Sequence, residues 1–388
     1  MDERRLSRRA FLSLATAATA SALPGIAPLP ALAGSGNRAK RRRRRRRKRR
    51  ELPPLPKVNG AINIQPIRRF GPDQEPVDVD LIPRIIDLQM RALYELGFDS
   101  VRMTLGFADQ GLNLLGAIPY LRAARALGID VLGLIGQFGY FHHLSNVLVD
   151  PEWRARVLDG YLKLYASPVE TASPVIAKSG ALTFQILNEP TNFLGITPSD
   201  YVLRFLAPTY EHLKHRAPEI PIVSAAPVGQ RVGVLRALEM LGSGVEDLCD
   251  IVGFHIYDRA IIHQLAGLTQ KPVWITETGA VGPENHKPWV DEVYPAIRSS
   301  LPQVGKIFFF ELFDLTPGAF RILDIAERQD GSITSEVEST VFYDDLSRRV
   351  SEAAGGTQRA LYEDLIPDIT AYFPTDDDIE LVFELLRD

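Results

Sequence analysis

The sequence predicts an α/β fold with a parallel sheet, because short apolar runs that favour strands alternate with longer helical stretches from residue 55 onward. Eight strand runs are present, at residues 58–64, 100–105, 131–136, 182–187, 222–225, 251–255, 273–276 and 306–310. Eight strand–helix repeats fit the size of a (β/α)8 TIM barrel. An open doubly wound sheet is disfavoured, because the turn at residues 65–68, Gln-Pro-Ile-Arg, lacks the usual glycine-rich phosphate pattern.

Helices are expected between these strands, at residues 79–96, 114–127, 198–216 and 232–241, with another beginning near residue 151. Gly97 and Gly128 end the first two, as glycine commonly does at helix C-termini. We expect the barrel to span residues 55–355, with its last helix within residues 335–354. Two stretches with acidic faces then predict a short C-terminal helical extension over residues 356–388.

The N-terminus has the pattern of an export signal. Residues 7–12 read Ser-Arg-Arg-Ala-Phe-Leu, a small apolar stretch follows, and Ala-Leu-Ala at residues 31–33 offers a cleavage site. A membrane anchor is the alternative, but Pro24 and Pro28 interrupt a run that is already short for a bilayer. We therefore expect residues 1–33 to be a twin-arginine signal peptide. The protein would be periplasmic, bound to the cell envelope or extracellular.

Charge is divided sharply along the chain. Of the 44 Lys and Arg residues 16 lie within residues 1–50, against two of the 48 Asp and Glu residues, so the remainder carries a formal charge of −18. The unbroken basic run 41–50 repels itself, which predicts a disordered Arg-rich linker at residues 34–54. The linker would either contact anionic envelope polymers or act as a plain spacer. The acidic domain gives no support for specific nucleic-acid binding.

Two glutamates stand at the ends of apolar strand runs. Residues 184–190 read Phe-Gln-Ile-Leu-Asn-Glu-Pro, and residues 274–279 read Trp-Ile-Thr-Glu-Thr-Gly. A carboxylate at the end of a buried strand is costly unless the site uses it. Because barrel chemistry gathers at the carboxyl ends of the strands, Glu189 and Glu277 predict one shared site.

Other polar residues stand at the same end of the predicted strands. They are Arg102, Asn188, His255, Tyr257 and Glu311. Glycosidic hydrolysis needs one carboxylic acid to protonate the leaving oxygen and a second carboxylate to attack the sugar or activate water. A separation of about 5 to 5.5 Å selects the covalent, retaining route. The two environments must also keep the acid protonated and the nucleophile ionised.

Asn-Glu-Pro at strand four, His-x-Tyr at strand six and Glu-Thr-Gly at strand seven together resemble the glycoside hydrolases of clan A. These are retaining (β/α)8 enzymes that include the cellulase-like families, and the resemblance covers about residues 55–325. It implies that Glu189 is the acid/base and Glu277 the nucleophile. It also implies that Asn188 binds the sugar hydroxyl next to the anomeric carbon.

The resemblance assigns supporting roles to three more side chains. Arg102 would lie beneath Glu277 and keep it ionised through a charge-assisted hydrogen bond. Tyr257 would donate to Glu277, and His255 would line the pocket near the acid/base. Arg102 and His255 can also be interpreted as structural residues, one pairing with another acid and one hydrogen-bonded in the core.

Substrate contacts beyond the two glutamates are less well defined by the sequence. Aromatic residues at 138–143 and Trp289 follow strands three and seven and are candidate sugar platforms, whereas Trp274, out of phase with Glu277, is expected under the outer helices. Gln137 and residues 308–314 depart from the cellulase-like pattern, which often has histidine and usually tryptophan there. Glu311 would bind a sugar hydroxyl or a cation, or pair with an arginine.

The sequence therefore favours an exported retaining β-glycoside hydrolase that acts on a poly- or oligosaccharide as a monomer without a cofactor. No metal site is expected, because His142 and His143 have no second ligand cluster at suitable spacing. Two alternatives stay open. One is a transglycosylase that remodels exopolysaccharide, and the other is a catalytically silent, envelope-tethered carbohydrate-binding barrel.

Overall fold

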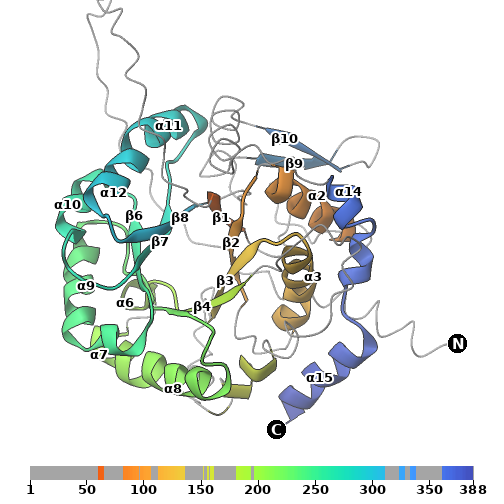
Figure 1. Ribbon diagram of the computed structural model, residues 1–388, viewed down its shortest axis with the longest axis horizontal. Helices are drawn as coiled ribbons and strands as arrows, with labels where there is room; N and C mark the ends of the chain where they lie inside the picture. The colour runs from red at the N-terminus through yellow and green to blue at the C-terminus, as the bar shows by residue number, and fades with distance from the viewer. Residues whose placement is uncertain are drawn as a thin grey trace, which may run out of the picture.

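The computed structural model describes residues 60–64, 82–95, 97–105, 112–135, 152, 155–156, 158–160, 181–193, 196–310, 323–327, 333–337 and 361–387. A ring of parallel strands lies at the centre and helices surround it (Figure 1). The strands are β1 (Gly60–Ile64), β2 (Ser100–Thr104), β3 (Asp130–Ile135), β4 (Leu182–Ile186), β5 (Ile222–Val223), β6 (Val252–Ile256), β7 (Val273–Thr278) and β8 (Val304–Phe309).

The parallel sheet is closed. Its strand order is β5-β4-β3-β2-β1-β8-β7-β6, so only the edges at β5 and β6 are left to meet. There Val223 and Ile251 form a parallel bridge, and the backbone N–H of Ser224 donates to the carbonyl of Ile251 at 3.0 Å. All eight predicted strands are found within a few residues of their expected bounds. The predicted (β/α)8 barrel is thus confirmed.

Helices cover the outside of this ring. The described helices before β8 are α2 (Ile82–Glu95), α3 (Leu112–Ala126), α6 (Pro190–Phe193), α7 (Pro198–Asp200), η2 (Tyr201–Leu206), α8 (Ala207–Arg216), α9 (Arg231–Gly242), η3 (Val245–Leu248), η4 (Arg259–Ile261), α10 (Ile262–Leu265), α11 (Pro283–Pro288), η5 (Trp289–Val293) and α12 (Tyr294–Ser300). The helix expected at 198–216 contains a π-helical turn, η2. Among the described helices, none combines the length and hydropathy that a bilayer crossing requires.

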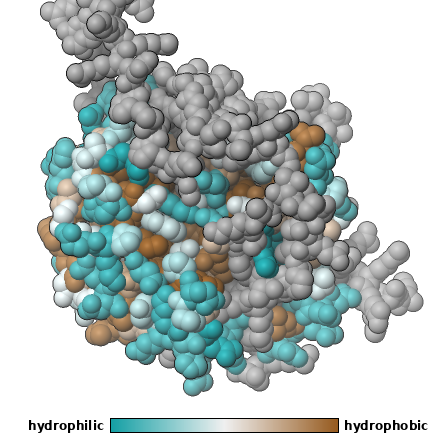
Figure 2. Space-filling view, viewed as in Figure 1, coloured by the Kyte–Doolittle hydropathy of each residue, from teal (hydrophilic) through white to brown (hydrophobic). Residues whose placement is uncertain are grey.

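The outer layer has the amphipathic character of a globular α/β domain. Helix α2 buries Ile82, Ile86, Met90 and Leu93, which recur at helical spacing on the face toward the sheet. Figure 2 shows that hydrophilic residues cover much of the coloured surface on this face, with hydrophobic residues scattered among them. Burial of this apolar stripe therefore helps to hold α2 on the barrel.

Strand β7 contains a β-bulge that decides which side chains face the barrel interior. Opposite β6, Ile275 pairs with Phe254, but the next pair is Glu277 with His255. The additional residue, Thr276, shifts the alternation by one position. Glu277 and His255 consequently lie on the same, inner face at neighbouring strand ends.

The bulge also places Trp274 inside the barrel, so the expectation that it lies under the outer helices is wrong. Its ring lies 5.9 Å from the ring of Phe308 and 5.0 Å from Nζ of Lys306. Lys306 in turn donates to Ser100 at 2.7 Å and to Asp130 at 2.9 Å, at the first residues of β2 and β3. This polar cluster fills the interior at the end of the barrel opposite to Glu277.

Beyond β8, the described segments are β9 (Leu323–Glu327), β10 (Ile333–Val337), α14 (Tyr362–Leu365), η6 (Ile369–Tyr372) and α15 (Asp376–Arg387). β9 and β10 pair antiparallel, so residues 335–337 belong to a strand and not to the expected last barrel helix. The C-terminal helices pack against α2 and α3: Tyr362 donates to Asp87 at 3.0 Å, and Arg122 binds Asp378 through two hydrogen bonds.

Asp378 both caps α15 and anchors it, so Asp378→Asn is expected to reduce stability by about 1–3 kcal/mol at pH 7. Its carboxylate accepts from the backbone and hydroxyl of Thr375, the N-cap residue, and pairs with Arg122. Burial alone would raise the pKa of Asp378, but these partners hold it below its ordinary value. The measurement is urea unfolding, with the exposed Asp377→Asn as control.

The effect should depend on pH with a defined sign. Because the pKa of Asp378 is depressed in the folded state, its contribution is complete above the pKa of the unfolded chain, about 4, and is lost as the pH falls through the folded value. The difference between the wild type and Asp378→Asn should therefore shrink below pH 4. An unchanged difference at pH 3 would contradict an ionic role for this residue.

Candidate active site

The turn after β4, which carries Asn188 and Glu189, has an unusual backbone. Leu187 and Glu189 have φ values of 63° and 41°, in the left-handed region that side chains other than glycine rarely adopt. Each such residue costs on the order of 1–3 kcal/mol. Backbone hydrogen bonds from Leu187 to Ile135 (2.8 Å) and from Glu189 to Ala226 (3.1 Å) hold the turn between β3 and β5.

Tyr201 supports the same turn from the helical layer. It is fully buried in the π-helical turn η2, and its hydroxyl donates to the carbonyl of Ile186 at 3.1 Å. The hydroxyl also accepts from the backbone N–H of Ala225 at 2.7 Å. Burial raises the pKa of Tyr201, which keeps the hydroxyl protonated. One side chain thus ties the ends of β4 and β5 together.

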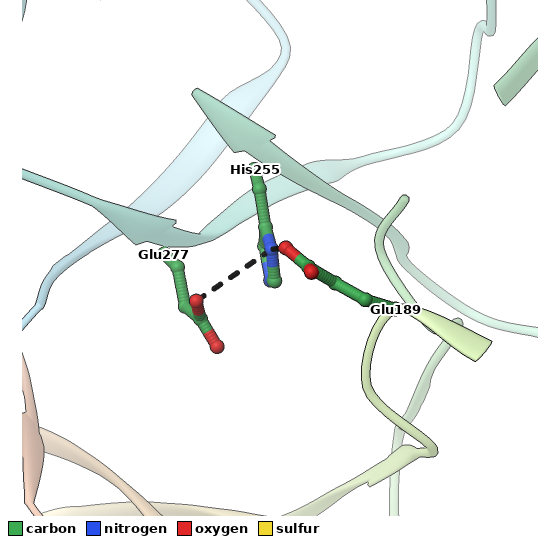
Figure 3. Close-up of side chains that lie close together, drawn as sticks. All are labelled: Glu189, His255 and Glu277. Carbon is green, nitrogen blue, oxygen red and sulfur yellow. Dashed lines mark hydrogen bonds and ion pairs between the residues drawn. The ribbon is translucent and has the colours of Figure 1, made fainter. Parts of the chain in front are cut away.

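Three titratable side chains meet at the carboxyl ends of β4, β6 and β7, as Figure 3 shows. Nδ1 of His255 lies 2.7 Å from Oε1 of Glu189 and 3.6 Å from Oε2 of Glu277. An oxygen of Glu189 and an oxygen of Glu277 lie within 4.8 Å of each other. Both glutamates are buried. They lie 88 positions apart in the sequence, and the fold brings them together.

Arg102 organises the Glu277 side of the site. Its Nη1 donates to Glu277 at 2.7 Å, and its Nη2 donates to Asn188 at 2.8 Å. Its Nε donates to Gln185 at 2.8 Å, and the hydroxyl of Tyr257 donates to the other oxygen of Glu277 at 3.0 Å. The structure therefore brings together Arg102, Asn188, Glu189, His255, Tyr257 and Glu277 from the sequence prediction, and it adds Gln185.

These contacts push the pKa of Glu277 below its ordinary value. Burial alone would raise it, but the electrostatic influence of His255 and Arg102 and the hydrogen bonds from Arg102 and Tyr257 outweigh the burial. Burial and the two carboxylates raise the pKa of Tyr257 well above its ordinary value, so its hydroxyl remains a donor. Glu277 is consequently held as an anion in a buried site, as a nucleophile requires.

Tyr257→Phe is expected to raise the pKa of Glu277, because it removes one donor to the carboxylate. Titration of the Glu277 side-chain carboxyl by ¹³C NMR measures the change without requiring turnover. Tyr210→Phe, which alters a half-buried tyrosine on α8, serves as control and should leave the titration unchanged. A Glu277 titration identical in Tyr257→Phe and the wild type would contradict the assigned hydrogen bond.

The cluster of Glu189, His255 and Glu277 also has the ligand types that could bind a metal ion. Among the described residues, Glu189, His255 and Glu277 offer ligand atoms within 4.8 Å of one another. However, the guanidinium of Arg102 already lies 2.7 Å from Glu277. This fixed positive charge opposes a divalent cation at the same carboxylate, and the carboxylate–guanidinium pair therefore suits an organic substrate better.

The expectation that Trp289 is an open-loop sugar platform is wrong. Residues 283–293 are helical, and the indole N–H of Trp289 donates to Thr278 at 3.1 Å. Its ring packs against Phe309 (5.0 Å) and Tyr294 (5.8 Å). Phe309 alternates with the inward-facing Phe308, so Trp289 lies between the sheet and its outer helices.

Several predicted contacts fall outside the described residues, namely Glu311, Gln137 and the aromatic residues 138–143. In the described part, sequence reasoning missed Gln185 and Tyr201. Gln185 could have been noticed as the one polar side chain inside the apolar run Phe-Gln-Ile-Leu at residues 184–187. Tyr201 carries no comparable signal, because a tyrosine near a helix start has no particular meaning by itself.

Sequence comparisons identify no relative of this chain: no family model matches it, and no curated protein does. Comparison with solved structures, in contrast, finds proteins of similar fold. A β-glucosidase from Thermotoga maritima aligns with 76% of this chain and 98% of its own, at 12% identity and a TM-score of 0.54. A GH1 β-glucosidase from Exiguobacterium antarcticum B7 aligns with 78% and 99%, at 12% identity and a TM-score of 0.52.

An aphid myrosinase also matches, over 76% of this chain and 98% of its own, at 10% identity and a TM-score of 0.51. At such low identity these likenesses concern the fold alone. They agree with the (β/α)8 fold that the sequence predicts. This chain therefore shares its fold with the two β-glucosidases and the myrosinase.

Proposed function

We propose that this protein is a retaining β-glycoside hydrolase with Glu277 as nucleophile and Glu189 as general acid/base. The observation that carries the proposal is the pair of buried carboxyl groups whose oxygens approach within 4.8 Å. An approach this close by one oxygen of each carboxyl favours the short separation of retaining enzymes over the wider separation of inverting ones. The solved β-glucosidases with the same fold support this reading.

In the first step, the carboxylate of Glu277 attacks the anomeric carbon and forms a glycosyl ester. The bond from that carbon to the leaving oxygen breaks, and protonated Glu189 gives its proton to this oxygen. In the second step, Glu189 takes a proton from water while the water oxygen attacks the same carbon. Glu277 leaves as a carboxylate, Glu189 is protonated again, and the configuration of the sugar is retained.

The neighbouring side chains support these two roles by charge and position. Arg102 and Tyr257 stabilise Glu277 as an anion and as a leaving group. Nδ1 of His255 lies at hydrogen-bond distance from Glu189 and orients its carboxyl toward the space shared with Glu277. Asn188 is held by Arg102 beside that space, where its amide can bind a sugar hydroxyl.

The proposal is tested with a panel of aryl β-glycosides and of β-glucans, mannans, xylans and bacterial exopolysaccharides. We expect hydrolysis of at least one member, and proton NMR of the first-formed sugar should show the β-anomer. Formation of the α-anomer would contradict the double displacement. No turnover on the whole panel, together with measurable binding, would favour a carbohydrate-binding barrel instead.

We further propose export by the twin-arginine route, with the basic segment 34–54 holding the acidic domain at anionic envelope surfaces. A protein of residues 34–388 should bind phosphatidylglycerol vesicles at about 0.05 M salt and release them near 0.5 M, because the attraction is screened. The matched control has residues 41–50 replaced by Gly and Ser and should not bind. Equal binding by both proteins would contradict the proposal.

A further inference from the structure

Gln185 contacts both the arginine that binds Glu277 and the turn that carries Glu189. It lies on β4, its side chain is fully buried, and it is paired in register with Val223 of β5. Its Oε1 accepts from Nε of Arg102 at 2.8 Å, and its Nε2 donates to the carbonyl of Leu187 at 3.3 Å. If the amide were flipped, its NH2 group would face the N–H of Arg102 and its oxygen would face the carbonyl of Leu187. These two contacts therefore define the amide orientation.

The contact with Arg102 fixes a direction as well as a distance. A guanidinium is planar, and its five N–H groups point in fixed directions. Once Nε is held by Gln185, the other two nitrogens are aimed at Glu277 and Asn188, which they bind at 2.7 and 2.8 Å. Loss of the acceptor would leave a buried N–H of a cation without that partner and allow the plane to tilt.

The contact with Leu187 acts on the other glutamate. Leu187 is the first of the two left-handed residues in the turn that carries Asn188 and Glu189. A strained turn keeps one geometry only when its surroundings over-determine it. The amide of Gln185 supplies one of these restraints from inside the barrel, while Tyr201 acts from the helical layer.

We infer that Gln185 is a positioning residue that aligns Arg102 with Glu277 and holds the turn of Glu189, so that one amide sets the relative placement of nucleophile and acid/base. This inference rests on the proposed glycosidase function. Gln185 is not itself a catalytic residue, because its contacts run to Arg102 and to the Leu187 backbone and not to either glutamate.

The prediction concerns the ionisation of Glu277, so every described group that faces this carboxylate matters. These groups are Arg102 from β2, Glu189 after β4, His255 from β6 and Tyr257 after β6. Gln185 touches only Arg102 among them in the described contacts. A misaligned Arg102 lowers the pKa of Glu277 less, so its titration should move to higher pH.

Two variants separate positioning from packing. Gln185→Met keeps the volume but loses both hydrogen bonds, whereas Gln185→Glu keeps an acceptor for Arg102. A packing role predicts that Met is tolerated better than Glu, because Met is apolar and Glu adds a buried charge. A positioning role predicts the reverse order in kcat, with Gln185→Met lower than the wild type by about 10- to 100-fold. Thr183→Val, two positions earlier on the same face of β4, is the matched control.

The deciding readout is the acidic limb of kcat/KM against pH, together with the ¹³C NMR titration of Glu277. Both should move to higher pH in Gln185→Met and stay unchanged in Thr183→Val. An unmoved limb in folded Gln185→Met would overturn the inference. If the wild type cleaves no glycoside, the proposed function fails, and the NMR titration still decides the role of Gln185.

Discussion

Glu277→Gln is expected to lower kcat/KM for aryl β-glycosides by about 10⁴-fold or more, because an amide cannot form the glycosyl ester. The change is nearly isosteric, and the amide oxygen can still accept the hydrogen bond from Arg102. The fold should therefore survive, and circular dichroism provides that check. Steady-state kinetics on the best substrate of the panel measures the effect.

The matched control is Glu380→Gln, which alters an exposed glutamate on α15. It should retain the activity of the wild type, because it is neither buried nor part of the site. A folded Glu277→Gln protein with more than about one tenth of wild-type activity would require another nucleophile, and the proposed mechanism would be wrong.

Glu189→Gln is expected to produce a loss that depends on the leaving group. General acid catalysis contributes about 10²- to 10⁴-fold, so glycosides with poorly acidic leaving alcohols should slow by that factor. Dinitrophenyl glycosides need no protonation, so their first step should persist and an initial burst of dinitrophenol should appear. The second step should then limit turnover, because no base activates water.

The pH dependence gives an independent check on the same variant. The wild type should show a basic limb in kcat/KM, since Glu189 must be protonated in the first step, and Glu189→Gln should lack it. Stopped-flow kinetics with a dinitrophenyl substrate measures the burst, and a pH series with a glycoside of a poorly acidic alcohol measures the limb. Equal losses for all leaving groups would contradict the acid/base assignment and would point to a positioning role for Glu189.

The barrel and the meeting of its strand ends could be predicted from local patterns. Each strand run is short, apolar and followed by a helical stretch, and parallel strands place their carboxyl ends at one face. Glu189 and Glu277 lie at such ends, so their convergence follows from topology once the ring is closed. No pairing partner had to be known in advance.

Details that depend on one residue of register could not be predicted. The bulge at Thr276 shifts the alternation of β7, and it turns both Trp274 and Glu277 toward the interior. Simple alternation from Glu277 therefore placed Trp274 on the wrong face. The prediction that Trp289 binds sugar was wrong for a different structural reason, because the segment after β7 is helical and not an open loop.

The contacts that support the two glutamates were even harder to predict from the sequence. The left-handed conformation of Leu187 has no sequence signal, because leucine rarely adopts it and only the packed surroundings enforce it. Tyr201 reaches the same turn from a π-helical turn, whose position the periodicity of residues 198–216 does not reveal. Gln185 alone gave a hint, as a polar residue within a buried strand.

Covalent labelling with a 2-deoxy-2-fluoro β-glycoside of the sugar that the panel identifies is the most direct measurement of the central claim. The fluorine slows hydrolysis of the glycosyl ester, so the intermediate accumulates and peptide mass spectrometry can locate it. The account predicts one equivalent of label, attached to Glu277. Attachment to any other side chain, or cleavage of the natural glycoside with inversion, would contradict it.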